Sequence, residues 1–565
     1  MRRHFAAALL TLGLACSYPG GPRTVVYQGE RYEKRPETGY RETDEQFLST
    51  FAIDVDTASY SNARRFIEAG QRPPAEAIRL EEFLNAFDYD YPQPGADQPI
   101  ALATELSVCP WAPQHQLLRV GLQARGRLEG PRRPRRLVLL LDVSGSMADP
   151  DRLPMLQQAL ATLVNRLGPE DRLAIVTYAG ISGVNLPSTP GDRHDLILDA
   201  LERLEAGGAT DGGRGLRTAY QMASQHFDPL AINRVILATD GDFNAGWTER
   251  SQLLKLIEGS AQENIFLSVL GVGRGNLNDT NLEYLADHGD GDYAYLDTLE
   301  RARQVLARQM DSSYETVARE VKIQVKFDPG RVSSYRLMGY ENRRLADQAF
   351  DDPKADGGEL GAGQSVTALY ELEAKAGEGA LGEIRVAYQK PNQDSSQSLV
   401  SKLPGRALAF EQSSPDQHLA AAAATFAMQL SDSKFKGDGC LEDVLMWAAA
   451  SLASGHVKQR YELLKLAQAS ASDETSDFDI IGHDERVSVS LLSTKPFEGD
   501  DLRDKRAGIY RVQTGLPAKL LAPLNPLALR HPDLPPEFWG RAVATAHAEL
   551  DFSRPKRPEG LGLFP

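Results

Sequence analysis

The feature that most constrains this chain is an alternation of short apolar segments with amphipathic segments between residues 136 and 314. The apolar runs lie at 137–141, 173–178, 234–238 and 265–270. Helical patterns lie between and after them, near 152–167, 192–205, 213–227, 249–262 and 298–311. Continuous apolar runs are typical of parallel strands that are buried on both faces. The alternation therefore predicts an α/β fold with a doubly wound, mostly parallel sheet, built from right-handed strand–helix–strand units.

Oxygen-bearing side chains follow two of these strands and occupy one loop between them. Asp142, Ser144 and Ser146 come directly after the first apolar run, and Asp240 follows the run at 234–238. Thr210 lies between them in a glycine-rich segment, just before a helical pattern. Sheets of this kind bind ligands in the crevice beyond the carboxyl ends of their central strands. We therefore expect these side chains to converge at one end of the sheet.

The pattern D-x-S-x-S, followed by a loop threonine and a strand-end T-D-G, resembles the metal-ion-dependent adhesion site of von Willebrand factor type A (VWA) domains. Matched position by position, the resemblance implies a metal site formed by Asp142, Ser144, Ser146, Thr210 and Asp240. It implies that both serines coordinate directly and that the threonine does so directly or through water. The aspartates then act through waters and hydrogen bonds. Mg²⁺ suits such hard oxygen ligands, with Mn²⁺ or Ca²⁺ as alternatives.

Neutral hydroxyl ligands leave a divalent cation under-neutralised, so that it attracts a carboxylate from outside. The resemblance therefore implies a docking point for a protein ligand that supplies an acidic side chain. A serine or aspartate after a strand can instead merely cap the next helix. Five matched positions on one strand–helix frame favour metal binding over this simpler explanation.

Catalytic and nucleic-acid-binding functions find little support in the sequence. No general base adjoins Ser144 or Ser146, and no G-x-S-x-G nucleophile motif or H-E-x-x-H zinc motif occurs. The segment 142–147 lacks the G-x-G-x-x-G turn of dinucleotide-binding folds. With 62 Lys and Arg against 78 Asp and Glu, the net charge is −16, which argues against binding to nucleic acid. We therefore predict that the protein is not an enzyme.

The N-terminus has the features of an export signal. Residues 1–16 combine a basic start with an apolar stretch that is too short to anchor the chain across a membrane. The stretch ends at Ala15-Cys16, which resembles a bacterial lipobox with Cys16 as the lipidated residue. Cleavage by ordinary signal peptidase is the alternative. Residues 17–46 are predicted to form a flexible tether. Together they predict an exported, membrane-anchored lipoprotein of the bacterial cell envelope, periplasmic or on the surface.

Residues 47–135 resemble the N-terminal extension of a group of bacterial VWA lipoproteins. The words D-V-D-T-A-S-Y at Asp54–Tyr60 and R-L-E-E-F-L-N at Arg79–Asn85 carry this match. Thr57 or Ser59 is expected to cap a helix that continues through residues 64–67. Ca²⁺ binding by the first two aspartates of the first word is a weaker alternative, because the rest of a calcium loop is absent. The aromatic series of this region is expected in the core, at Phe83, Phe87, Tyr89 and Tyr91.

Three segments follow the α/β region. Residues 315–412 alternate apolar and polar side chains and predict a β-rich segment. Residues 413–475 are predicted to be helical, and a capping box at Ser414–Gln417 begins the first helix. Residues 476–565 are rich in proline, which predicts a poorly ordered, extended tail. Two cysteines in the predicted folded regions either form a disulfide or, as we favour, remain separate buried thiols, Cys109 and Cys440.

The leading prediction is a non-enzymatic binding or adhesion protein of the cell envelope, whose Mg²⁺ site docks an acidic group of a protein partner. The alternative is a VWA assembly subunit that recruits a partner ATPase or an envelope complex. A metal-assisted hydrolase is a third hypothesis. Contact with the membrane is expected only through the lipid anchor, and no nucleic-acid partner is expected.

Overall fold

The computed structural model describes most of the chain between residues 30 and 470 and three strands beyond it. Within this range the residues that are not described are 34, 96, 127–132, 180–182, 209–211, 242–246, 275–276, 309–315, 353–354, 392, 394 and 455. None of the described helices combines the length with the apolar character that a membrane crossing requires.

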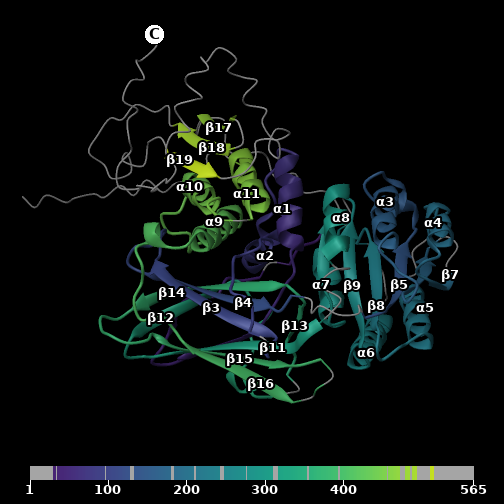
Figure 1. Ribbon diagram of the computed structural model, residues 1–565, viewed down its shortest axis with the longest axis horizontal. Coiled ribbons are helices and arrows are strands. Elements are labelled where there is room, and N and C mark those ends of the chain that lie inside the picture. The colour runs from purple at the N-terminus through teal and green to yellow at the C-terminus, as the bar shows by residue number, and fades with distance from the viewer. Residues whose placement is uncertain are drawn as a thin grey trace, which may run out of the picture.

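A six-stranded sheet forms the unit that the apolar runs predict, and Figure 1 shows helices on both of its faces. Its strand order is β10-β9-β8-β5-β6-β7, and all neighbours are parallel except β6 and β7. The strands are β5 (Arg135–Asp142), β6 (Arg172–Tyr178), β7 (Gly183–Pro190), β8 (Ile232–Thr239), β9 (Ile265–Val272) and β10 (Tyr293–Leu296). The helices are α3 (Leu153–Val164), α4 (His194–Glu202), α5 (Gly212–Gln225), α6 (Trp247–Gln262), α7 (Asp279–Asp287) and α8 (Leu299–Arg308). The doubly wound α/β prediction is confirmed.

Alternate side chains of the central strands enter two separate cores. Leu137, Leu139 and Leu141 of β5 pack on one face, in a cluster that includes residues of α3, α4 and α8. Val138 and Leu140 point to the other face and join residues of α5, α6 and α7. Each covered face of a strand requires an apolar side chain at every second position. Because both faces of β5 are covered, every position is apolar, which explains the unbroken apolar run.

Two further sheets pack face to face as a β-sandwich. One has the order β1-β12-β14-β4-β3, and the other has the order β13-β11-β15-β16 with β2 beside β11. The first contains β1 (Arg41–Glu42), β3 (Ile100–Val108), β4 (Gln116–Ala124), β12 (Val332–Met338) and β14 (Ser365–Ala374). The second contains β2 (Leu48–Ala52), β11 (Thr316–Phe327), β13 (Gly358–Gly361), β15 (Gly382–Gln389) and β16 (Ser396–Lys402). Residues 47–135 and 315–412 therefore contribute strands to the same two sheets.

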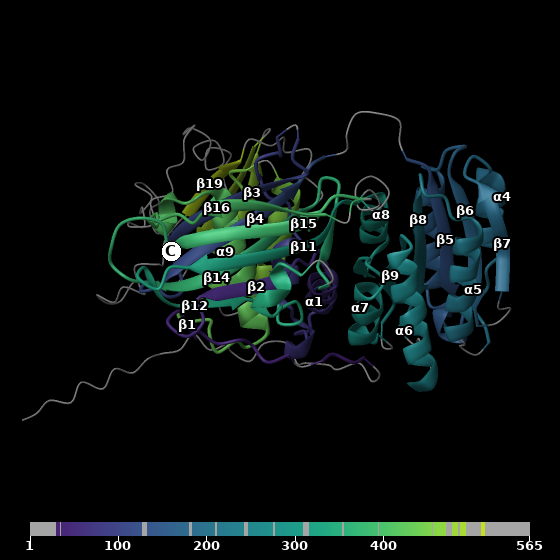
Figure 2. The same ribbon diagram turned by 90° about the horizontal axis from the view of Figure 1, so that it is seen from below.

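A helical layer covers the outer face of the first of these sheets. It contains α1 (Ala58–Glu68), α2 (Leu80–Asn85), α9 (Pro415–Leu430), α10 (Leu441–Ser451) and α11 (Val457–Ser470). The core beneath it holds the aromatic series that the sequence placed there, and the alanine run of α9 at 420–424 is fully buried. Figures 1 and 2 agree that α1 lies at the side of this layer that faces the six-stranded unit, where it packs against β10.

Several local predictions can be compared with the structure. Ser414 caps α9, since its side chain accepts a hydrogen bond from the Gln417 amide. Thr57 occupies the N-cap position of α1 but makes no capping hydrogen bond. Ser59 does not cap either, because its hydroxyl donates to the Ala77 carbonyl and accepts from the Arg79 amide. The two described cysteines, Cys109 and Cys440, are buried and free.

The segment predicted as a tether is anchored over its described part. β1 pairs with β12, Glu30 forms a buried ion pair with Arg65 at 2.8 Å, and Arg35 contacts Glu283 at 3.0 Å. A flexible tether is therefore wrong for residues 30–46. These anchors are ion pairs and a two-residue strand, so they leave no hydrophobic periodicity in the sequence.

Three strands are described in the proline-rich tail. β17 (Asp477–His483), β18 (Arg486–Leu492) and β19 (Tyr510–Thr514) form an antiparallel sheet. They are extended, as the sequence suggested, but paired rather than disordered. None of the three contains proline, so the restriction that proline places on strand pairing does not apply to them.

Candidate metal centre

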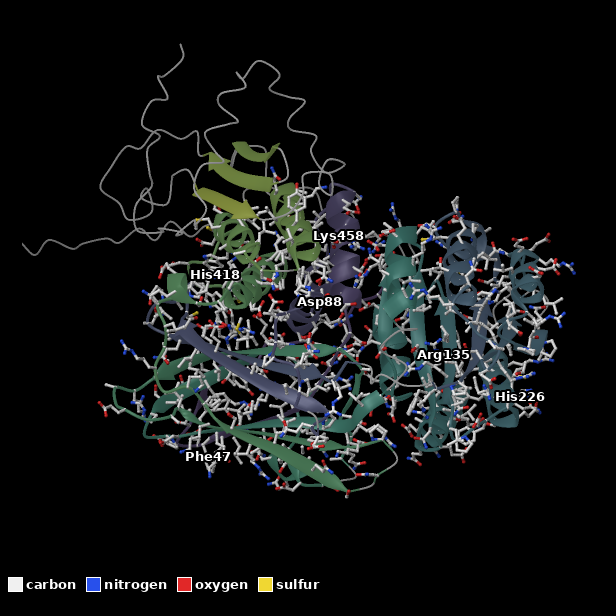
Figure 3. All side chains as sticks on the ribbon, viewed as in Figure 1. Phe47, Asp88, Arg135, His226, His418 and Lys458 are labelled. Atoms are coloured by element: carbon white, nitrogen blue, oxygen red, sulfur yellow. The ribbon has the colours of Figure 1, made fainter. Side chains whose placement is uncertain are left out.

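The proposed metal site lies where two neighbouring parallel strands end. Asp142 is the last residue of β5, and Asp240 directly follows β8. Ser144 and Ser146 lie on the turn after β5, which continues as a short 3-10 helix over Gly145–Ala148. Arg135 at the start of β5 and His226 just after α5, both labelled in Figure 3, mark the opposite end of the sheet. The structure thus brings four of the five predicted residues to one edge, whereas Thr210 lies outside the described residues.

Asp142 is fully buried, and hydrogen bonds hold its carboxylate in place. Its Oδ1 accepts the Ser144 amide at 2.8 Å, and its Oδ2 accepts the hydroxyls of Tyr178 and Thr239, each at 3.0 Å. Burial raises the pKa of Asp142, the bonds from Ser144 lower it, and the Asp240 charge raises it again. Burial also raises the pKa of the Tyr178 hydroxyl well above its ordinary value, so this hydroxyl remains a donor. The carboxylate is therefore fixed in position before any ion arrives.

The two serines present a pair of neighbouring hydroxyl oxygens. Their Oγ atoms lie 3.0 Å apart, a separation that suits two adjacent ligands of one small cation. Ser144 is buried, whereas Ser146 is half-buried. Among the described residues, no histidine or lysine is hydrogen-bonded to either hydroxyl.

Asp240 supplies the observation that tests whether a metal fits. The residue is 1% exposed, and its Oδ2 accepts a hydrogen bond from Arg152 at 2.9 Å. Its other oxygen, Oδ1, is buried without any hydrogen-bond partner. A buried carboxylate oxygen left unpaired is costly, and a hydrated cation beside it would remove that cost. The residues present therefore fit a divalent cation.

The loop that leads to Thr210 is held against the serine turn. The Gly207 amide donates to the Val143 carbonyl at 2.7 Å, and the Gly145 amide donates to the Gly208 carbonyl at 3.4 Å. These bonds tie the residues two and three positions before the threonine to the turn that carries both serines.

Arg152 is a site residue that the sequence did not reveal. Its guanidinium donates to the Asp240 carboxylate, to the Ser146 carbonyl and to the Arg274 carbonyl. Gly273, at φ +75°, makes room for it, since a Cβ there would lie 2.4 Å from the arginine side chain. An arginine six residues after the serine turn has no periodicity that distinguishes it from a surface residue of α3, so only the fold shows its role.

Acidic residues alone do not make this site. Among the residues that the structure describes, no three histidine, cysteine, aspartate or glutamate side chains are grouped so that they could hold a metal ion. A cation at the ends of β5 and β8 would therefore depend on hydroxyl oxygens as well as on two carboxylates. This donor set suits Mg²⁺, which retains several waters, better than it suits a metal enclosed by protein ligands. The other predicted modification site, Cys16, lies outside the described residues.

Three family models match separate parts of the chain. The model described as von Willebrand factor type A domain matches residues 137–242, which contain all five predicted metal ligands. The model described as uncharacterized protein YfbK, C-terminal, matches residues 312–472. A third, described as von Willebrand factor, matches residues 26–119.

Individual proteins show the same similarity. The chain is 39% identical over 364 residues to the uncharacterized protein YfbK of Escherichia coli K12, and the match covers 63% of each protein. It is 25% identical over 297 residues to the uncharacterized protein sll0103 of Synechocystis, covering 51% of this chain and 69% of that one. A solved structure of a von Willebrand factor type A protein from Catenulispora acidiphila aligns at 16% identity with a TM-score of 0.39, covering 68% of this chain and 92% of that chain. The match thus spans less than two thirds of the length of the E. coli relative.

Proposed function

We propose that this chain, which belongs to the VWA domain-containing proteins and carries a YfbK-type C-terminal domain, binds a protein partner through a divalent cation at the ends of β5 and β8. VWA domains generally mediate contacts between proteins and often do so through such an ion. The observation that carries the proposal is the unpartnered, buried Oδ1 of Asp240 beside the hydroxyl pair of Ser144 and Ser146.

The charges of the site favour an acidic partner. Asp142 and Asp240 supply two carboxylates, and the Arg152 guanidinium already neutralises one of them through its ion pair. When Mg²⁺ is bound, it supplies positive charge that these residues do not fully balance. Because Ser146 is only half-buried, a carboxylate from outside can approach this side of the site, and charge-assisted contacts with it are stronger than neutral ones.

The same geometry argues against catalysis at the serines. The Asp142 carboxylate beside Ser144 already accepts hydrogen bonds from Tyr178, Thr239 and the Ser144 amide. A nucleophilic serine needs a base that is oriented to take its proton. We therefore propose a binding role, not a hydrolytic one.

Two measurements test this function. First, titration calorimetry with MgCl₂ on the purified chain is expected to show binding that Asp240→Asn and Ser146→Ala abolish. Asp192→Asn, an exposed carboxylate in the turn before α4, is the matched control and is expected to bind normally. Second, the purified chain is expected to capture partners from a membrane extract when Mg²⁺ is present. The capture is expected to fail with EDTA or with Asp142→Ala. Normal Mg²⁺ binding by Asp240→Asn, or capture that survives EDTA, would remove the proposal.

We further propose that the protein is an exported lipoprotein of the cell envelope, anchored through Cys16. The support is the signal-like sequence of residues 1–16. Metabolic labelling with a fatty acid is expected to mark the wild-type chain and not Cys16→Ser, which should leave the membrane fraction. Equal labelling of both chains would contradict the anchor.

A further inference from the structure

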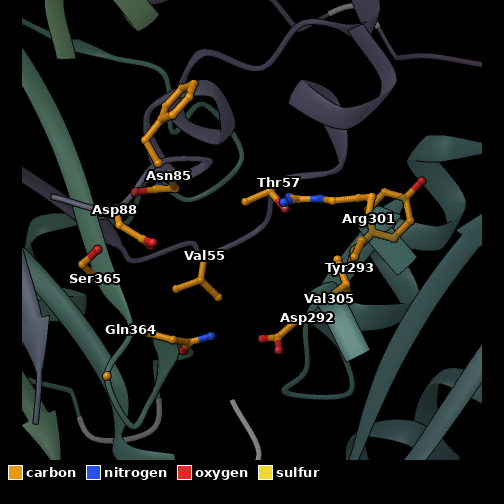
Figure 4. A pocket seen from close by; sticks show the side chains of 13 residues that line it. Val55, Thr57, Asn85, Asp88, Asp292, Tyr293, Arg301, Val305, Gln364 and Ser365 are labelled. Carbon is orange, nitrogen blue, oxygen red and sulfur yellow. The ribbon is translucent and has the colours of Figure 1, made fainter. Parts of the chain in front are cut away.

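A cavity lies where the VWA domain, the N-terminal region and the β-sandwich meet. It has a volume of about 170 Å³, and each of the three parts contributes to its lining. Figure 4 shows the polar ends of Asp88, Gln364 and Asp292 directed toward the space around Val55. Arg301 lines the same cavity, and its guanidinium donates to the Thr57 hydroxyl at 3.3 Å.

A second, smaller cavity of about 20 Å³ adjoins the first. Val55 and Asp292 line both, so the two spaces are adjacent. The carboxyl side chains that line the smaller cavity are Asp54, Asp56, Asp287, Asp290, Asp292 and Glu359. The cation in its lining is Arg343, which contacts Asp287 at 2.9 Å and Asp54 at 3.6 Å.

One of these carboxylates lacks a partner on the protein. Asp56 is 3% exposed, and its Oδ1 accepts the Tyr293 amide at 2.8 Å. Its Oδ2 is buried and has no hydrogen-bond partner. Burial raises the pKa of Asp287 and Asp290 to about 7 and that of Asp56 well above its ordinary value. Carboxyl groups with such raised pKa values are partly protonated in the unliganded junction, and a cation bound beside them would favour their charged form.

A metal ion is a poor match for the carboxyl groups of this junction. The carboxyl groups come from β13, from the segment before α1 and from the end of α7 and the loop after it, and no three of the described acidic side chains are grouped to hold a metal. Separated carboxylates are better matched by a longer cation with a positive group at each end. Arg343, which reaches two carboxylates with one planar group, shows how an organic cation satisfies them.

We propose that this junction binds a linear aliphatic polyamine. One ammonium group would lie beside Asp292, which lines both cavities, and within reach of Asp56 Oδ2 in the smaller one. The other would lie near Asp88 in the larger cavity. The methylene chain would contact Val55, Phe87 and Val305, which line the larger cavity. A cavity of roughly 150 Å³ accepts a molecule of about six carbon atoms, so a space of about 170 Å³ holds a diamine of four methylene groups.

Such a ligand would join the three parts that form the junction. Asp56 and Asp88 belong to the N-terminal region and Asp292 to the VWA domain, whereas Gln364 comes from the β-sandwich. A molecule that binds the folded arrangement stabilises it in proportion to its concentration. The proposal does not depend on the metal site, which lies at the ends of β5 and β8.

The test uses the full chain in EDTA, so that the metal site does not contribute. Calorimetry and thermal melting with putrescine and spermidine are expected to show binding and a rise in the melting temperature. Asp292→Asn is expected to weaken binding by about tenfold or more, the loss typical of one charge-assisted hydrogen bond. Its side chain is not in the metal site, and Asp97→Asn, on an exposed turn, is the matched control that should bind normally.

Two further probes that do not use Asp292→Asn keep the test decisive if that variant folds poorly. 1,4-Butanediol has the same chain with hydroxyl ends and is expected not to bind. Ca²⁺ at the same concentration is expected not to raise the melting temperature in chelator-free buffer with Asp240→Asn. Binding of the diol, an equal effect of Ca²⁺, or unchanged putrescine affinity in folded Asp292→Asn would overturn the proposal.

Discussion

Replacing Arg152 by methionine separates its two effects on the metal site. The guanidinium holds the Asp240 carboxylate at 2.9 Å and also donates to the Ser146 carbonyl. Methionine retains much of the side-chain volume but removes the charge and the donors. Asp240, at 1% exposed, then loses the guanidinium that its Oδ2 contacts, while its Oδ1 already has no hydrogen-bond partner.

The expected magnitude follows from the burial of this pair. Removing one partner of a buried ion pair costs about 3–5 kcal/mol, because the other charge is left uncompensated. A bound divalent cation next to Asp240 would offset part of that cost. If it recovers about 2 kcal/mol, the Kd for Mg²⁺ falls by roughly thirtyfold. Arg152→Met is therefore expected to be less stable than the wild type in EDTA and to bind Mg²⁺ more tightly.

Calorimetric titration with MgCl₂ measures the affinity, and thermal melting in EDTA and in Mg²⁺ measures the stability. Arg152→Lys keeps a positive charge at the same place and is the matched control, expected to bind Mg²⁺ within a few-fold of the wild type. A folded Arg152→Met chain that binds Mg²⁺ no more tightly than the wild type would refute the reasoning. That result would mean that Arg152 supports the serine turn more than it competes for Asp240.

Three further predictions concern the frame around the site. Arg79→Met removes the cation that pairs with two buried carboxylates, so urea unfolding should show a free energy of unfolding lower by about 3–5 kcal/mol. Arg203→Met, which removes an ion pair on the surface, should change this free energy little. Gly215→Ala places a Cβ 2.6 Å from Tyr178, so we expect the folded chain to be destabilised by about 1–3 kcal/mol and to bind Mg²⁺ more weakly. An unchanged melting temperature would contradict this. Burial raises the pKa of Asp290 to about 7, so unfolding releases a proton, and stability falls as the pH rises from about 4 through 7. Melting at pH 5 and pH 8 should show this fall, and Asp290→Asn should reduce it.

The sequence was informative where one physical rule acts along a short stretch of chain. A run such as 137–141 is apolar at every position because both faces of β5 are covered. Parallel strands bring their carboxyl ends to one edge, so the residues after two such runs had to meet. Asp142 and Asp240 therefore could be placed together although they lie 98 positions apart in the sequence. In the structure Thr239, the residue before Asp240, donates its hydroxyl to Asp142.

The sequence was much less informative where distant segments pair. Nothing in the sequences of β2 and β4 indicates that they pair with β11 and β14, which lie more than two hundred residues later. Antiparallel edge strands such as β7 carry prolines and exposed side chains, and so resemble loops. Arg152 was missed for a related reason, since its partners come from three different loops.

The two words that carry the N-terminal resemblance lie at the junction between the VWA domain, the N-terminal region and the β-sandwich, and their contacts there explain what their side chains do. Arg79 of the second word forms buried ion pairs with Glu82 and with Asp279 of the VWA domain. Asp56 of the first word accepts the amide of Tyr293, the first residue of β10. Asn85 bonds the Asp54 carbonyl, the Tyr340 hydroxyl and the Thr367 amide, so it joins the first word to the β-sandwich.

Each of these polar side chains is fixed by a partner from another part of the molecule, and none of them belongs to the metal site. Breaking one of the buried ion pairs costs several kcal/mol, so the VWA domain is held in one orientation relative to the β-sandwich and the helical layer. A partner that binds at the ends of β5 and β8 therefore meets a site whose direction is set by the rest of the chain. The side chains of the two N-terminal words thus hold this joint through a buried ion pair and hydrogen bonds to its neighbours, and these contacts form without any ligand at the metal site.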